Sequence, residues 1–352
     1  MAIEWESSDY QDALTELNLE LQQNPDDIDA YYARSELYYS VEDYDAGIKD
    51  LNTILQRNSQ EVLAYMFRAY GYGQLNNYLL AIDDYNTVLD LSPNYAKAYF
   101  NRGTMYHKLE QYQQAIADFD LAIKLDPDYA DAYYNRAIVK NQLEYYQQAI
   151  SDYTEVIRLQ PNEETAYYNR GNTYNKLKQY PQAITDYNRA ISLKPEDLEA
   201  YYNRANVYHK TQAYSQAIAE YNHVIKFNSR HAPTYYNRGT TYLATQDFAM
   251  AIADFTKAIK LNPNYTEAYY NRAVAANKIG EYQKAIADHQ QAIKLKPNYA
   301  EAYGNLGLVY QTVGDKRQAI KHLKQAATLF KQQNNQALSQ YVEDKLVALR
   351  SQ

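Results

Sequence analysis

The sequence repeats itself every 34 residues, and this period restricts the fold more than any other feature. A near copy of the pentapeptide AYYNR returns at constant spacing, and its first alanine stands at Ala30, Ala64, Ala98, Ala132, Ala166, Ala200, Ala268 and Ala302, with Thr234 in the remaining position. No insertion interrupts the register. A fixed period of this length predicts a solenoid, in which each repeat buries its apolar face against its neighbours.

Composition limits the classes of function. The 352 residues carry a net charge of −8, which argues against a nucleic-acid footprint. There is no cysteine, so disulfides and thiolate metal sites are excluded. The acidic N-terminal segment lacks a signal-peptide core, and no apolar run reaches the length of a membrane span, so we expect a soluble, cytoplasmic protein.

One repeat, residues 96–129, holds two apolar stripes at helical spacing. The first runs through Tyr99, Gly103 and Tyr106, and the second begins at Tyr112 and contains Ala115, Ile116, Phe119, Ala122 and Ile123. Pro127 is expected to end the second helix. Gly103 and Ala115 are small enough to let the two helices approach closely. Each repeat is therefore predicted to be a pair of antiparallel helices.

This pattern resembles the tetratricopeptide repeat, a helix-turn-helix of 34 residues, in its tyrosine-rich bacterial type. The resemblance implies an all-α fold, an α-solenoid that winds as a right-handed superhelix. It covers nine repeats, at residues 28–61, 62–95, 96–129, 130–163, 164–197, 198–231, 232–265, 266–299 and 300–333. Residues 1–27 match a half-repeat that caps the N-terminal end, and residues 334–352 predict one amphipathic capping helix.

A charged pair recurs with the same period. An arginine in the first helix is followed sixteen residues later by an acid, as in Arg136 and Asp152, and in the ninth repeat both change together, to Leu306 and His322. A half-buried guanidinium needs a carboxylate partner. We interpret the pair as a structural bond between the two helices of one repeat. The alternative is a pair between neighbouring repeats, for which Glu16 would be suitable.

The resemblance places the first helices on the concave surface, where polar side chains line a groove. Stacked repeats then form a row of asparagines: Asn101, Asn135, Asn169, Asn203, Asn237 and Asn271. An amide both donates and accepts, so this ladder can bracket the backbone of an extended peptide; the alternative is that asparagine is only the repeat consensus. A row of rings runs beside it: Tyr32, Phe100, Tyr134, Tyr168, Tyr202, Tyr236 and Tyr270. These rings either anchor a ligand or pack against the next repeat.

Other sites are disfavoured. The carboxylate clamp of heat-shock co-chaperones is absent, because Tyr168 or Tyr202 stands in the place of its first lysine. The six histidines have no metal-ligand spacing, and the repeats leave no segment for a catalytic domain. We therefore predict a non-enzymatic scaffold without a cofactor that binds a protein or peptide partner. The alternatives are an assembly factor or chaperone for a larger complex, which is possibly membrane-associated, and a self-associating structural module.

Overall fold

The computed structural model describes residues 7–351, and this part of the chain consists of helices joined by short turns. Residues 1–6 of the predicted N-terminal cap, and residue 352, lie outside the described residues. The helices form two compact bodies, an N-terminal body that ends at Lys178 and a C-terminal body that begins at Gln179. The all-α solenoid fold predicted from the period is confirmed.

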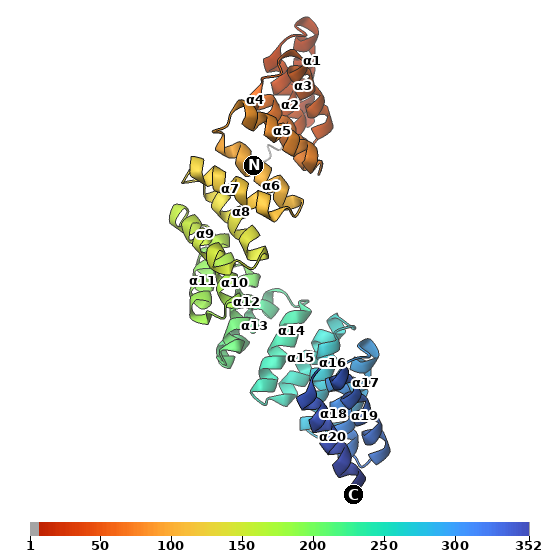
Figure 1. Cartoon of the computed structure of the whole chain (residues 1–352). Helices are drawn as coiled ribbons and strands as arrows, with labels where there is room; N and C mark the ends of the chain where they lie inside the picture. Colours follow the sequence, from red (N-terminus) through yellow and green to blue (C-terminus); the bar gives the residue numbers. More distant parts are fainter. Residues whose placement is uncertain (1–6, 352) are drawn as a thin grey trace. The chain divides into compact units, whose positions relative to one another are not determined.

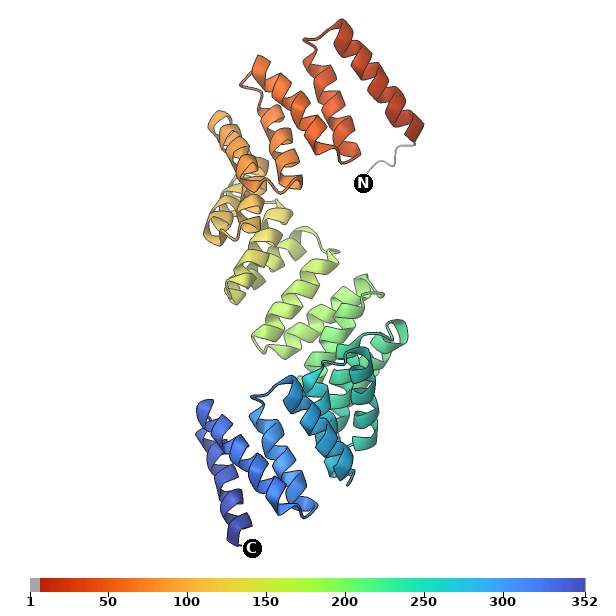
Figure 2. The same ribbon diagram turned by 90° about the vertical axis from the view of Figure 1, so that its right-hand side faces the viewer.

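Within each body, helices that follow one another in the chain lie side by side (Figures 1 and 2). The N-terminal body contains α1 (Ser7–Gln23), α2 (Ile28–Ser40), α3 (Tyr44–Arg57), α4 (Val62–Gln74), α5 (Tyr78–Leu91), α6 (Ala96–Lys108), α7 (Tyr112–Leu125), α8 (Ala130–Gln142), α9 (Tyr146–Leu159) and α10 (Glu164–Lys176). The C-terminal body contains α11 (Tyr180–Leu193), α12 (Leu198–Lys210), α13 (Tyr214–Phe227), α14 (Ala232–Ala244), α15 (Phe248–Leu261), α16 (Thr266–Lys278), α17 (Tyr282–Leu295), α18 (Ala300–Thr312), α19 (Lys316–Gln332) and α20 (Gln336–Ser351).

The third repeat shows how the sequence sets the helix ends. Helix α7 ends at Leu125, two residues before Pro127, which cannot donate to the hydrogen-bond ladder of a helix. The turn between α6 and α7 contains Glu110 in the left-handed conformation, with φ at 58°. Gly280 and Gly314 occupy the same position in the last two repeats and reach this conformation without a side-chain penalty.

Close approach of the two helices depends on small residues, as expected. A Cβ atom on Gly103 would lie 2.9 Å from the ring of Phe119. Ala115 and Phe119 are themselves completely buried. A side chain at position 103 would therefore require the Phe119 ring or the helices to shift, so the predicted close contact is confirmed here.

The arginine of the recurring charged pair bonds to two helices other than its own, as Arg68 shows. Arg68 donates from Nε and Nη2 to the two carboxylate oxygens of Asp84, at 2.8 and 2.6 Å, within the same repeat. Its Nη1 donates to Asn52 of the preceding repeat at 2.6 Å. The guanidinium carbon also lies 5.3 Å from the ring centre of Tyr65, a cation–π distance. We call this arrangement the arginine node.

The arginine node recurs along the chain with the same three bonds. Its arginines include Arg34, Arg68, Arg102 and Arg136 in the N-terminal body and Arg238 and Arg272 in the C-terminal body. The predicted pair within one repeat is confirmed. A bond to the neighbouring repeat exists as well, but Arg34 donates to Asn18 and not to Glu16. The side chain sixteen residues before the arginine faces it across the repeat boundary.

The node at Arg204 is incomplete, because its acid is a glutamate. Glu220 accepts one bond from Nη2 of Arg204 at 2.7 Å. Nε of Arg204 and the second carboxylate oxygen of Glu220 are buried without a hydrogen-bond partner. The longer side chain has turned one oxygen away from the guanidinium, and leaving buried polar atoms unpaired lowers stability.

Replacing this glutamate by the acid of the other nodes should stabilise the protein. We expect Glu220→Asp to raise the free energy of unfolding by about 1 kcal/mol, because it forms one further charge-assisted hydrogen bond. Thermal and denaturant unfolding followed by circular dichroism measures the change.

The matched control is Asp254→Glu, which introduces the same defect into a complete node. It should lower the free energy of unfolding by a similar amount. If the Glu220→Asp protein is less stable than the parent, the glutamate stabilises this node despite its two unpaired atoms, and the interpretation of the node as incomplete is wrong.

Candidate functional site

The predicted asparagine row is bonded to the predicted tyrosine row. Nδ2 of Asn237 donates to the hydroxyl of Tyr202 in the preceding repeat at 2.8 Å. The same bond joins Asn169 to Tyr134 at 2.8 Å and Asn271 to Tyr236 at 3.1 Å. Each asparagine is half-buried on a first helix. The two rows therefore form one set of contacts between neighbouring repeats.

The rings of the tyrosine row pack mainly inside the fold. The ring of Tyr236 lies 5.9 Å from that of Phe255 and 4.7 Å from that of Tyr265, between centroids. Burial is the largest cause that raises the pKa of Tyr236 above its ordinary value. Tyr168 on α10 and Asn203 on α12 are half-buried as well. Of the two uses expected for these rings, packing accounts for most of their surface.

Sequence reasoning missed the last member of the asparagine row. Asn305 on α18 donates to the hydroxyl of Tyr270 at 2.9 Å, as the earlier asparagines do to their tyrosines. The period itself identifies this residue, because it lies 34 positions after Asn271. The pentapeptide has changed to AYGNL in the ninth repeat, and this change hides the match.

Two asparagines of the row differ from the others, and both line a pocket in the N-terminal body. Phe100 stands where six other repeats have tyrosine, so it offers no hydroxyl to Asn135, whose side chain makes no hydrogen bond within residues 7–351. Asn101 lies within hydrogen-bonding reach of the Tyr85 hydroxyl. The pocket has a volume of about 380 Å³ and is lined by residues of α4, α5, α6 and α8, including Tyr70, Gly73, Tyr78, Tyr85, Phe100, Asn101, Thr104, Lys108 and Asn135.

A missing side chain contributes to this pocket. Gly73 stands at a position where the next two repeats have His107 and Asn141. A Cβ atom at Gly73 would first meet the sulfur of Met105, at 3.2 Å. The pocket thus combines aromatic rings, the ammonium group of Lys108 and four carboxamides, those of Gln74, Asn76, Asn101 and Asn135, a mixture that suits a peptide better than a purely apolar ligand.

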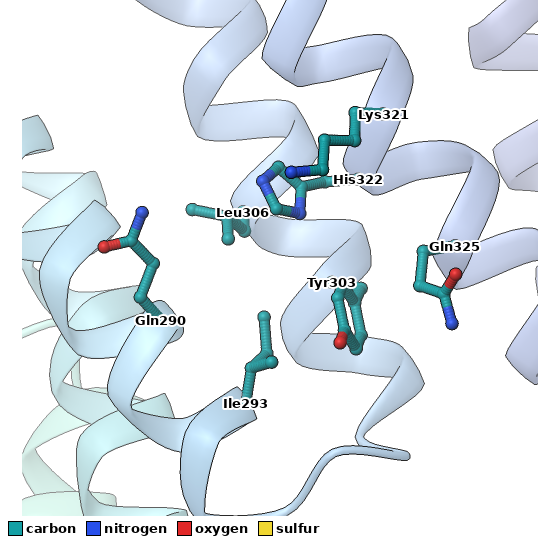
Figure 3. Close-up of a pocket in the computed structure, with 7 residues that line it drawn as sticks. All are labelled: Gln290, Ile293, Tyr303, Leu306, Lys321, His322 and Gln325. Atoms are coloured by element: carbon teal, nitrogen blue, oxygen red, sulfur yellow. The ribbon is translucent and has the colours of Figure 1, made fainter.

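The ninth repeat lacks the arginine node and contains a cavity in its place. Leu306 is completely buried, and a cavity of about 300 Å³ lies between α17, α18 and α19 (Figure 3). Figure 3 shows Gln290 and His322 on opposite helices beside Leu306. The ring of His322 stacks on that of Tyr310 with centroids 5.5 Å apart, and its Nδ1 is buried without a partner. Burial is the largest cause that lowers the pKa of His322.

Restoring the node should fill this cavity. The single substitution Leu306→Arg places a cation in the core without its acid and should lower the melting temperature by several degrees. The double variant Leu306→Arg/His322→Asp supplies the acid, and we expect it to recover at least half of that loss, because neighbouring charged groups are coupled by about 1 kcal/mol or more. Differential scanning calorimetry of the parent and the three variants measures the coupling.

His322→Asp alone completes the cycle and should also destabilise the protein, because it removes the stacked ring. Strictly additive effects of the two substitutions would contradict the interpretation that this cavity occupies the place of the arginine node of the other repeats.

Within residues 7–351 no group of three or more histidine, cysteine, aspartate or glutamate side chains is arranged to hold a metal ion. Among the helices of the same range, none has both the length and the apolar content that crossing a bilayer requires.

Comparison with protein-family models identifies the repeats. Models described as "TPR repeat" match residues 71–109, 171–212 and 275–314. Models described as "Tetratricopeptide repeat" match residues 96–129, 130–163, 152–185, 198–231, 232–265, 255–287 and 300–333. Together the matches cover residues 71–333 without a gap. No curated protein sequence matched the chain.

Several solved structures are similar to parts of the chain. The crystal structure of MamA is 25% identical, with a TM-score of 0.45, over 47% of this chain and 96% of its own. YrrB, described as a TPR protein with an unusual peptide-binding site, is 22% identical with a TM-score of 0.46, over 52% and 95%. A tetratricopeptide repeat protein from Parabacteroides merdae ATCC 43184 is 20% identical with a TM-score of 0.53, over 71% and 99%, and shows the shared fold. The chain belongs to the tetratricopeptide repeat family.

Proposed function

We propose that the protein is a non-catalytic scaffold that holds an extended segment of a partner protein on the face formed by the first helices of its repeats, which we call the first-helix face. Tetratricopeptide repeats in general support protein–protein interaction. In the N-terminal body, the pocket at Asn101 and Asn135 is the site where the segment is gripped. The observation that carries the proposal is the side chain of Asn135, which has no hydrogen bond in the described chain and lines an open pocket.

A carboxamide suits the backbone of an extended peptide. It offers two N–H donors and one carbonyl acceptor, which match the acceptor and donor of a peptide group. Asn101 and Asn135 are one repeat apart, so they can contact successive stretches of one segment. The rings of Tyr70 and Phe100 in the same pocket provide apolar contact for a side chain of that segment.

The other asparagines have fewer hydrogen-bonding atoms left for a partner. The amide nitrogen of Asn169 donates one hydrogen bond, to Tyr134. That of Asn237 donates two, one to Tyr202 and one to Asn206. Their carbonyl oxygens remain as acceptors. In this proposal the tyrosine bonds orient the amides of the row, and Asn101 and Asn135 contribute most of the binding energy.

Two substitutions test the grip by opposite means. Asn135→Ala removes the amide, and Phe100→Tyr supplies the hydroxyl that engages the asparagine in other repeats. We expect both to reduce capture of partner proteins from extracts of the source cells, each by about twofold to tenfold, the effect of one neutral hydrogen bond. Quantitative mass spectrometry of the captured proteins measures the loss.

The matched control is Gln113→Ala on the exposed side of α7, away from the pocket. It should retain the same partners at parental levels, and all three variants should keep the parental helix content. If Asn135→Ala and Phe100→Tyr retain every partner at the parental level, the pocket is not the binding site and the proposal fails.

A further inference from the structure

A second irregularity of the aromatic row lies in the C-terminal body. In the seventh repeat (232–265), the ring of Tyr236 fills the space beside Phe255 and Tyr265. In the ninth repeat the same position holds Gly304. A Cβ atom added there would meet nothing closer than Ala326, at 3.8 Å, and Phe330, at 4.0 Å. The place of one aromatic side chain is therefore unfilled.

This place is a pocket with apolar walls. It has a volume of about 190 Å³, and its lining includes Tyr270, Leu308, Leu323, Phe330, Leu338 and Tyr341. Leu323 stands in the ninth repeat where Phe255 stands in the seventh, nineteen residues after the aromatic position. The pocket therefore has a wall that corresponds to the surroundings of the rings in earlier repeats.

The capping helix α20 borders this pocket without filling it. Val342, Leu346 and Leu349 are buried against the ninth repeat, as the amphipathic pattern predicts. Leu338 and Tyr341, on the same helix, remain 39% and 48% exposed. Both line the pocket. The two residues extend the apolar surface from the pocket to the solvent, so α20 is more than a polar cap.

Carboxylates accompany the aromatic row in this body. Glu199, Glu267 and Glu301 occupy equivalent positions in three repeats, and all three are exposed. Their charges help to raise the pKa of Tyr202, Tyr236 and Tyr270 respectively, in each case after the larger effect of burial. None of the three forms an ion pair within residues 7–351. Glu301 itself lines the pocket, so the surface around it is complementary to a positively charged segment.

We propose that the C-terminal body binds a basic segment of a partner protein whose aromatic side chain enters the pocket at Gly304. The aromatic ring takes the place that Tyr236 fills in the seventh repeat. Lysine or arginine residues beside it face the carboxylates of Glu267 and Glu301. This inference rests on the proposed binding of a partner segment on the first-helix face and specifies the chemistry of that segment.

The experiment uses the full chain and a fluorescently labelled synthetic peptide in which one phenylalanine is flanked by lysines. Fluorescence anisotropy should detect binding to the parent protein at low salt. A peptide with alanine in place of the phenylalanine should bind at least about tenfold more weakly, the expected loss for one buried aromatic contact. A peptide with glutamates in place of the lysines should not bind.

Two substitutions at position 304 distinguish the effect of filling the pocket from the effect of replacing a glycine in helix α18. Gly304→Phe fills the pocket with the kind of side chain found in earlier repeats and should weaken peptide binding at least about tenfold. Gly304→Ala leaves most of the pocket open and should bind within about twofold of the parent. Equal or higher melting temperatures of both variants show that they are folded.

Charge is tested by the double variant Glu267→Gln/Glu301→Gln, with Glu196→Gln as the control on an exposed turn. The double variant should bind the lysine peptide about threefold to tenfold more weakly and with less dependence on salt, whereas the control should bind like the parent. Loss of binding in the control as well would show that net charge alone attracts the peptide.

Three results would overturn the inference: no binding of the lysine peptide, equal binding by Gly304→Phe, or tighter binding of the glutamate peptide. The proposed function is judged separately by Asn135→Ala and Phe100→Tyr. If those variants lose their partners while Gly304→Phe keeps all of them, the grip at Asn135 stands and the pocket at Gly304 is excluded.

Discussion

Each arginine node forms two kinds of bond at once, and the packing of the repeats depends on both. In the node at Arg68, the carboxylate of Asp84 joins the two helices of one repeat, and Asn52 joins that repeat to the one before it. Asp84 is only 4% exposed; this burial raises the pKa of its carboxyl group, and the hydrogen bonds and charge of Arg68 act in the opposite direction. A shift of one repeat against the next, or the loss of either side chain, would leave a buried group without its partner. The node therefore favours a single register of the repeats.

Much of this could be predicted from the sequence, because a period of 34 residues constrains every repeat in the same way. The helices and the Arg136–Asp152 pair follow from spacing and charge alone. The alternative, a pair with the neighbouring repeat, named Glu16 as the partner; a bond to that repeat does exist beside the predicted pair, but Asn18 accepts it. The asparagine–tyrosine bonds escaped prediction, since the two residues are half-buried together in a contact that only the stacked repeats create.

Asn101 and Asn135 belong to the row predicted from the sequence, but the two pockets could not be predicted, because they arise where a repeat lacks a side chain that its neighbours have. Phe100 lacks the hydroxyl that would occupy Asn135, and Gly304 lacks the ring that would fill its own pocket. In a sequence these differences look like neutral variation within a consensus. In the structure they leave a polar or an apolar surface exposed on the first-helix face. Elsewhere on that face, the asparagine and aromatic side chains mainly contact neighbouring repeats.

A double-mutant cycle on the arginine node tests the central claim, that one guanidinium joins neighbouring repeats. Unfolding free energies of Arg68→Leu, Asn52→Ala and the double variant should give a coupling of about 0.5–1.5 kcal/mol. The pair Arg68→Leu and Asn222→Ala, whose asparagine belongs to the node at Arg238, should be additive. Additivity of Arg68 with Asn52 as well would contradict the claim, because the guanidinium would then contribute nothing to the contact between neighbouring repeats.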